Sequence, residues 1–152
     1  MEFGPSCAAS FRDELKELFP SDARAEYLSR NVLTFGEYLR RRGFELPHRG
    51  GTALVHMHCN HRAVMGVDAD LDVIESLFDR CEVPEPGCCG MAGPFGFDAS
   101  KYDVSMRIAE HALLPAVRVA DSRVTLIADG FSCREQILQG TGREAVHLAE
   151  AV

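Results

Sequence analysis

The chain has 152 residues, of which 46% are hydrophobic and 26% charged, and its formal net charge is −7. These values fit one globular domain with its own core. The acidic excess argues against a surface that neutralises nucleic-acid phosphates. No apolar run approaches the roughly 20 residues that cross a bilayer, and the start of the chain lacks the pattern of a secretory signal. We therefore expect a cytoplasmic protein whose six cysteines stay reduced and serve metal binding or redox chemistry.

The first third of the chain is predicted to be helical. Apolar residues at helical spacing mark a first helix that ends at Pro20, and Ser21-Asp22 can cap a second helix. Thr34 and Glu37 form the capping-box pattern of a third helix. Gly43 is predicted to close that helix.

From residue 50 onward, predicted strands alternate with predicted helices. The strands are 52–56, 81–83, 124–128 and, near the end of the chain, 145–148. The helices are 71–78, capped by Asp68 or Asp70, 100–117, bent near Pro115, and 132–139, capped by Ser132 and stopped by Gly140. Strands that alternate with helices imply a layered parallel sheet with flanking helices. We therefore expect an α/β fold with a helical N-terminal third.

The cysteines follow the predicted strands. Cys59, the adjacent pair Cys88 and Cys89, and Cys133 each come just after one. In a parallel sheet, sites form where strands end and helices begin. The fold is therefore predicted to gather these thiols at the C-terminal edge of the strands, near positive helix ends that favour thiolate.

The segment Gly87-Cys88-Cys89-Gly90 is the most informative part of the sequence. Two adjacent thiols cannot both face one side of a strand, so a glycine-rich loop that holds them indicates a site. Thiolate sulfur is the ligand that iron–sulfur clusters and zinc select. A vicinal disulfide or two buried thiols is the alternative for this pair. The glycines predicted to let the backbone approach a cofactor closely are Gly87, Gly90 and Gly93.

Other residues around these cysteines have open roles. His58 and His61 flank Cys59 and can serve as ligands or as hydrogen-bond donors to sulfur, with a capping or solvated role as the alternative. Gly4-Pro5-Ser6-Cys7 resembles Gly130-Phe131-Ser132-Cys133 at three of its four positions, which makes Cys7 a further candidate ligand. Cys81 lies in an apolar stretch and is predicted to be structural.

Four segments together resemble the cysteine-rich CCG domain of heterodisulfide reductase and glycolate oxidase iron–sulfur subunits. The resemblance is strongest to the C-terminal part of FAD-linked oxidases of the D-lactate and D-2-hydroxyglutarate dehydrogenase type. The segments are residues 2–7 with 11–14, 56–61, 87–93 with 95–96, and 128–134. The resemblance implies that residues 1–46 are the helical tail of a truncated first CCG unit. Residues 50–152 are then a complete second unit, and both pack as one domain.

The resemblance also implies an iron–sulfur cluster of the 4Fe–4S type. Its ligands are expected to be Cys59, Cys88, Cys89, Cys133 and Cys7, with His58 beside it. Gly4 and Gly130 stand where the family has the first cysteine of a late pair. FAD would bind only on upstream domains that are missing here.

The function implied is an electron-transfer module of an oxidoreductase that acts on 2-hydroxy acids. We expect no catalytic residue in this chain and no dehydrogenase activity from it alone. Its partners would be flavin or ferredoxin-type domains, or a subunit of the same oxidoreductase, and an exposed sheet edge suggests self-association. Two alternatives remain open: a structural zinc module and a thiol–disulfide redox domain that uses Cys88 and Cys89.

Overall fold

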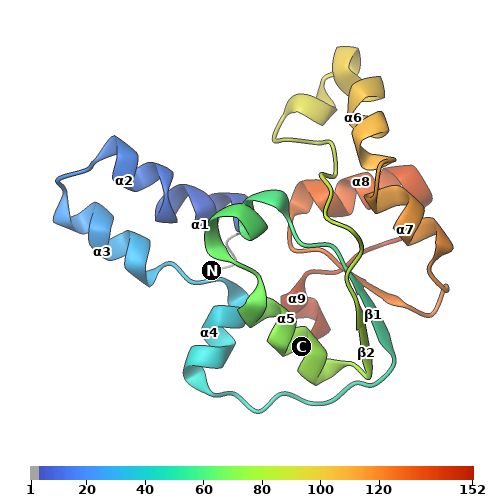
Figure 1. The fold of residues 1–152 in the computed structure, drawn as a ribbon, viewed down its shortest axis with the longest axis horizontal. Coiled ribbons are helices and arrows are strands. Elements are labelled where there is room, and N and C mark those ends of the chain that lie inside the picture. The colour runs from blue at the N-terminus through green and yellow to red at the C-terminus, as the bar shows by residue number, and fades with distance from the viewer. Residues whose placement is uncertain (1–3) are drawn as a thin grey trace.

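The computed structural model describes residues 4–152, so Glu2 and Phe3 of the first resembling segment lie outside the described residues. A three-stranded parallel sheet forms the centre of the molecule, with strand order β2-β1-β3 (Figure 1). The strands are β1 (Thr52–Val55), β2 (Arg80–Glu82) and β3 (Thr125–Ile127). The predicted α/β fold with a parallel sheet is confirmed.

The last predicted strand, 145–148, is wrong apart from one contact. Val146 forms an isolated parallel bridge with Ile127 at the edge of β3. The chain then turns into α9 (Leu148–Ala151), because His147 and Glu150 form a capping box that starts a helix.

Alternating side chains of the strands divide the core into two layers. Val55 and Ile127 point to one face, where they pack with Ile74 and other apolar residues. Leu54 and Leu126 point to the other face. The helices that supply the first layer are α4 (Phe35–Arg42), α5 (Asp68–Leu77) and α9. Those that supply the second layer are α7 (Leu113–Val119) and α8 (Phe131–Thr141). The sheet is thus covered by helices on both sides.

The N-terminal helices form an arm that projects from the body (Figure 1). They are α1 (Pro5–Arg12), α2 (Glu14–Leu18) and α3 (Ala23–Asn31). The helical N-terminal third is confirmed, although the first predicted helix breaks at Asp13. The predicted caps are also confirmed: Asp22 accepts a hydrogen bond from the N–H of Arg24, and Thr34 forms the capping box of α4. Gly43 ends α4 in the left-handed conformation, at φ +66°.

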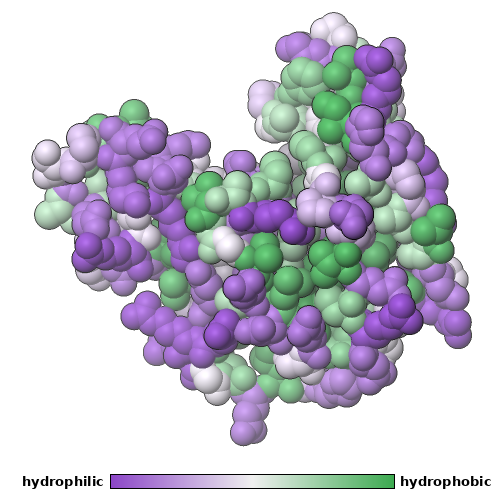
Figure 2. All heavy atoms as spheres, viewed as in Figure 1, coloured by the Kyte–Doolittle hydropathy of each residue, from purple (hydrophilic) through white to green (hydrophobic). Residues whose placement is uncertain are grey.

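A second projection follows the double-cysteine loop. It consists of the short turns η2 (Phe95–Phe97) and η3 (Ala99–Lys101) and of α6 (Tyr102–Ala109). Figure 2 shows a broad notch between this projection and the N-terminal arm. The predicted single helix 100–117 is divided here into α6 and α7. Pro115 lies in the first turn of α7, where a missing N–H costs no hydrogen bond, so the helix is interrupted ahead of the proline.

Two predicted helix boundaries are wrong at α8, and one is wrong at α5. Ser132 lies inside α8, whose N-cap is Gly130, and the helix continues past Gly140 to end at Gly142, with φ +71°. A Cβ at Gly140 would lie 2.7 Å from Leu114 Cδ1, so this glycine serves close packing of α8 on α7. Neither Asp68 nor Asp70 caps α5, since both lie within the helix. In residues 4–152 no helix combines the length and apolarity needed to cross a membrane.

Candidate functional site

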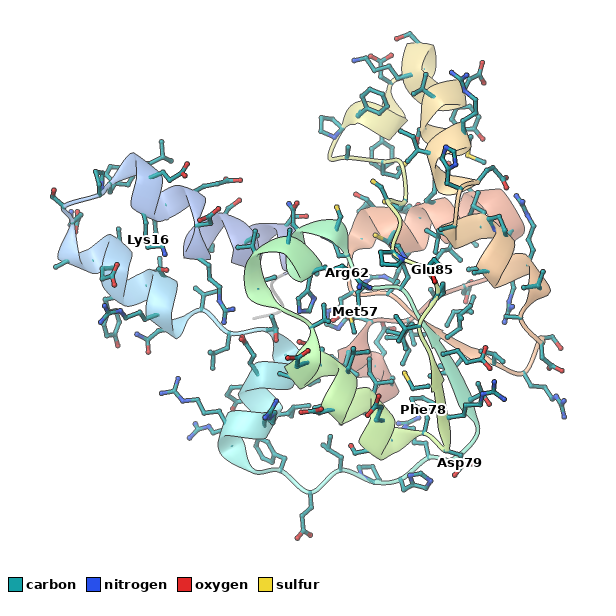
Figure 3. The ribbon with its side chains drawn as sticks, in the orientation of Figure 1. Lys16, Met57, Arg62, Phe78, Asp79 and Glu85 are labelled. Carbon is teal, nitrogen blue, oxygen red and sulfur yellow. The ribbon has the colours of Figure 1, made fainter. Side chains whose placement is uncertain are left out.

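The candidate site lies at the carboxyl ends of the three strands. Cys59 follows β1 and precedes a π-helical turn, η1 (His61–Met65), a feature frequent at functional sites. Cys88 and Cys89 lie in the loop that follows β2, and Cys133 lies in the first turn of α8, after β3. Arg62 and Glu85, on two of these connections, mark this edge in Figure 3, and Asp79 marks the opposite end of the sheet. This parallel arrangement brings together cysteines that are far apart in the sequence.

Four thiols lie close enough to interact electrostatically. Cys133 interacts with Cys59, Cys88 and Cys89, and Cys88 interacts with Cys59 and Cys89. The exposure of the four side chains decreases from Cys59 to Cys133. Cys59 is exposed and Cys88 is half-buried, whereas Cys89 and Cys133 are only 4% and 1% exposed. We call this group, Cys59, Cys88, Cys89 and Cys133, the thiol chain.

The buried end of the thiol chain favours one negative charge. The hydrogen bond from the Cys133 thiol is the largest influence on Cys89 and lowers the pKa of Cys89 to about 6, although burial opposes the shift. The backbone N–H groups of Met91 and Ala92 also donate to the Cys89 sulfur. The same bond between the two sulfurs raises the pKa of Cys133, and burial raises it further. Cys89 is therefore the thiolate of the pair and Cys133 the thiol donor near neutral pH.

Cys88 is held differently from its neighbour in the sequence. Burial raises the pKa of Cys88, while the N–H of Gly90, which donates to its Sγ at 3.3 Å, opposes the shift. Cys88 is therefore a neutral thiol near pH 7.

The three predicted glycines lie in different surroundings. Gly90 has φ +86°, and a Cβ there would lie 2.1 Å from the carbonyl oxygen of Ser105 in α6. A Cβ at Gly87 would lie 2.8 Å from Cβ of Ala112, whereas Gly93, at φ +63°, has no atom within 4 Å of that position. Gly90 and Gly87 thus let the loop lie directly against the α6–α7 segment. A role of these glycines toward a cofactor stays a prediction.

His58 connects two elements beside the thiol chain. Its Nδ1 accepts a hydrogen bond from the N–H of Asn60 at 3.2 Å, so the ring proton is on Nε2, which lies 3.3 Å from the hydroxyl oxygen of Ser6 in α1. Burial lowers the pKa of His58, and the nearby His61 adds to this effect. His58 is therefore a neutral imidazole whose two nitrogens both have protein partners.

Gly130 is a site residue whose role sequence reasoning missed. A Cβ at this position would lie 2.6 Å from Cδ2 of His58 and 3.0 Å from Sγ of Cys133. The absence of a side chain lets the imidazole and the thiol approach the start of α8. The local signal in the sequence was a glycine directly before a predicted helix. The family resemblance marked this position only because the family has a cysteine where this chain has Gly130.

A buried contact between His61 and Asp70 supports the turn that carries Cys59. His61 Nε2 lies 3.2 Å from Asp70 Oδ2, and both side chains are 1% exposed. Asp70 also accepts hydrogen bonds from Thr34 Oγ1 at 2.7 Å and from the N–H of Gly36 at 2.9 Å. Burial alone would raise the pKa of Asp70, but the bonds from His61 and Thr34 lower it overall. Asp70 thus ties η1 to α4 and α5, a role that its predicted position as a helix cap did not indicate.

The remaining two cysteines lie apart from the thiol chain. Cys7 is exposed on α1, a helix that packs against η1, but within residues 4–152 no interaction between sulfur atoms joins it to the four thiols. Cys81 is half-buried in β2, packs against the first core layer and pairs with Ala53. Burial raises the pKa of Cys81, and Glu75 and Glu82 raise it further. This environment agrees with the structural role predicted for Cys81.

The thiol chain fits a metal centre in the kind of donor it offers. Among residues 4–152, no three His, Cys, Asp or Glu side chains converge as a ready group of metal ligands. They nevertheless comprise four sulfur donors, one of them stabilised as thiolate, with backbone N–H groups directed at two of the sulfurs. Such hydrogen bonds to sulfur accompany iron–sulfur ligation and tune its potential. Cys59, Cys88, Cys89 and Cys133 are therefore the residues that would hold a cluster or a zinc ion.

The chain is similar to parts of longer proteins. It is 32% identical to a D-2-hydroxyglutarate dehydrogenase from Escherichia coli (strain K12), over 97% of this chain and 14% of that protein. A D-2-hydroxyglutarate dehydrogenase from Pantoea ananatis is 29% identical over the same shares of the two chains. The corresponding protein from Pseudomonas putida is also 29% identical, over 71% of this chain and 11% of the relative. The chain therefore spans a small part of the relatives that it matches. No family model and no solved structure matches it.

Proposed function

We propose that this chain is a CCG-type electron-transfer domain of an FAD-linked oxidoreductase that acts on 2-hydroxy acids. In this proposal the thiol chain ligates an iron–sulfur cluster, of the 4Fe–4S type that the family resemblance implies. The observation that carries the proposal is the meeting of four thiols from three separate connections at the carboxyl edge of the sheet. The similarity to parts of D-2-hydroxyglutarate dehydrogenases supports the class of enzyme.

The residues of the chain have defined tasks in this function. A bound cluster would accept and release single electrons. Cys89 offers a thiolate at neutral pH, since its pKa is about 6. The N–H groups of Gly90, Met91 and Ala92 donate to sulfur, which stabilises negative charge and favours the more reduced state of the centre.

Oxidation of the hydroxy acid itself is assigned to other parts of the oxidoreductase. The relatives are several times longer than this chain, since it covers only 14% of two of them. We propose that FAD and the substrate bind on a flavin domain or subunit, from which this domain receives electrons. D-2-hydroxyglutarate is the candidate substrate because the relatives carry that name.

Metal and sulfide analysis tests this proposal. The chain is purified without oxygen, reconstituted with iron and sulfide, and measured for both elements and for a visible absorption band. The proposal predicts iron with matching labile sulfide, and loss of both in Cys88→Ser and Cys89→Ser. Cys81→Ser is the matched control and should keep the full content, because Cys81 packs in the sheet rather than in the thiol chain.

Two results would contradict the iron–sulfur assignment. Full iron and sulfide content in both the Cys88→Ser and Cys89→Ser variants would exclude these residues as ligands. A colourless protein that binds one zinc ion through the same cysteines would instead support a structural zinc module.

A further inference from the structure

A long connection without regular structure joins α4 to β1, at the end of the sheet opposite the thiol chain (Figure 1). We call its residues 44–51 the strap. Glycines with positive φ stand at both ends of the strap, Gly43 at +66° and the pair Gly50 and Gly51 at +72° and +76°. Because glycine adopts this conformation without steric cost, the backbone can turn at both ends of the strap.

The middle of the strap has few polar attachments to the rest of the protein. Within residues 4–152, no hydrogen bond between backbone groups involves residues 45–48. Further along, the N–H groups of Arg49 and Gly50 donate to the carbonyl oxygen of Leu77 at 2.7 and 3.2 Å. The side chain of His48 therefore supplies the polar attachment of the middle segment.

Both ring nitrogens of His48 face oxygen atoms that accept hydrogen bonds. Nδ1 lies 3.0 Å from the carbonyl oxygen of Ser76, in the last turn of α5, and Nε2 lies 2.9 Å from Oδ1 of Asp79, just before β2. A neutral imidazole carries one N–H, whereas the protonated ring carries two. Both contacts are therefore hydrogen bonds at the same time only when His48 is protonated.

We propose that His48 is a pH-sensitive clasp, which holds the strap on the junction between α5 and β2 while the ring is protonated and loosens it when the ring loses its proton. In the neutral ring, the nitrogen without a proton presents its lone pair to an oxygen that also carries lone pairs, so one of the two contacts becomes repulsive. The clasp does not depend on a metal centre, because it lies away from the thiol chain.

The partners of the clasp favour the protonated ring. The pKa of His48 is raised, mainly by the hydrogen bond to the Ser76 carbonyl and then by the hydrogen bond to Asp79. The pKa of Asp79 is lowered by the hydrogen bond from His48 and by the N–H of Gly51, which donates to its Oδ2 at 2.6 Å. Asp79 thus stays ionised throughout the range in which His48 titrates.

Other charged side chains on the surrounding elements do not compete for the imidazole. Two exposed acidic residues, Glu45 in the strap and Glu75 in α5, carry the sign of charge that favours the protonated ring. The remaining ones bond elsewhere: Arg80 with Glu82 in β2, Arg40 with Asp72 between α4 and α5, and Arg49 with the carbonyl oxygen of Val152.

The clasp is closed at low pH and opens as the pH rises. His48 gains its two acceptors on folding, so its hold on the strap is complete below the ordinary pKa of histidine, about 6.5. This hold is lost as the pH rises through the higher pKa of the folded protein. Release loosens Phe44 and Leu46, which form one wall of a cavity of about 350 Å³ between α4 and α5. The clasp thus controls how closely the strap covers this side of the first core layer, against which Leu46 packs.

Two NMR measurements on the reduced, metal-free chain test the clasp. The first follows the His48 ring through a pH titration, in which it should titrate above about 6.5. The second measures the exchange with water of the Arg49, Gly50 and Gly51 amides at about pH 5.5 and 8.5, relative to an unstructured peptide of the same sequence. The protection of these amides should be about twofold to fivefold lower at the higher pH, as expected when an exposed charged pair is lost.

Three variants separate the clasp from a general effect of pH. His48→Gln should show the loosened strap at both pH values, and its spectrum identifies the His48 signal. Asp79→Asn replaces the carboxylate with an amide that can donate to the neutral ring, so the pKa of His48 should fall and the pH dependence of protection should disappear. His111→Gln, at an exposed histidine between α6 and α7, is the matched control and should behave as the unsubstituted chain. Circular dichroism checks that each variant is folded.

Three outcomes would overturn the proposal. One is a His48 ring that titrates at or below its ordinary value. Another is equal protection of the strap amides at the two pH values in the unsubstituted chain. A third is an unchanged pH dependence of protection in His48→Gln or Asp79→Asn. None of these readouts involves iron or sulfide, so failure of the clasp is distinguishable from failure of the electron-transfer proposal.

Discussion

Gly90→Ala should destabilise the protein mainly by pushing the double-cysteine loop off α6. The new methyl group would lie 2.1 Å from the carbonyl oxygen of Ser105, which is helix backbone and cannot rotate away. Overpacking of this kind costs about 1–3 kcal/mol. The left-handed backbone at φ +86° adds about 1–2 kcal/mol for any residue with a Cβ. The expected loss is therefore about 2–5 kcal/mol of unfolding free energy.

Gly93→Ala is the matched control for this prediction. Gly93 lies in the same loop and also has a positive φ, +63°, but a Cβ there meets no atom within 4 Å. Its substitution should lower the unfolding free energy only by the cost of a left-handed backbone, about 1–2 kcal/mol. Urea unfolding of the reduced, metal-free variants, followed by far-ultraviolet circular dichroism, measures the difference. The difference between the two variants should be about 1–3 kcal/mol, and the unfolding free energy should depend on urea concentration with the same slope in both. Equal losses in the two variants would refute the packing of this loop on α6.

Asp70→Asn should lower the unfolding free energy by about 3 kcal/mol in the same assay, since it weakens a buried pair with His61. Asp68→Asn, an exposed change in the same helix, should cost less than about 1 kcal/mol, and equal effects would contradict the bridging role of Asp70. The pH dependence of thiol alkylation tests the charge on Cys89, because its thiolate fraction rises as pH increases through about 6. Mass spectrometry of reduced protein labelled between pH 5 and 9 should place the half-maximal Cys89 rate near 6, and a midpoint near 9 would contradict the hydrogen bond from Cys133.

Local signals in the sequence predicted the elements whose ends depend on local chemistry. The α4 helix begins at Thr34 with Glu37 in a capping box and ends at Gly43, as expected. Both the capping box and the C-terminal glycine act on backbone groups only a few residues away, so the local sequence reveals them. The end of α8 was misplaced for the opposite reason. Gly140 is small because it packs against Leu114 on a neighbouring helix, and such a contact leaves no mark in the local sequence.

The same division holds for the candidate site. The alternation of strands and helices predicted that Cys59, Cys88 with Cys89, and Cys133 lie at one edge of the sheet, and the structure brings these four thiols close enough to interact. Which of them are buried depends on side-chain directions and could not be read from spacing. The carboxylate of Asp70 was taken for a helix cap for a related reason, since its partners lie on other elements.

The imidazole of His58 lies between the N-terminal arm and the start of α8. Its Nε2 lies 3.3 Å from the hydroxyl oxygen of Ser6 in the arm, and its Cδ2 lies 2.6 Å from the position that a Cβ of Gly130 would take. That same position is 3.0 Å from the Cys133 sulfur. Any side chain at residue 130 would therefore displace the imidazole, the sulfur or both, so a residue without a side chain preserves the seam between the arm, the central strand and α8.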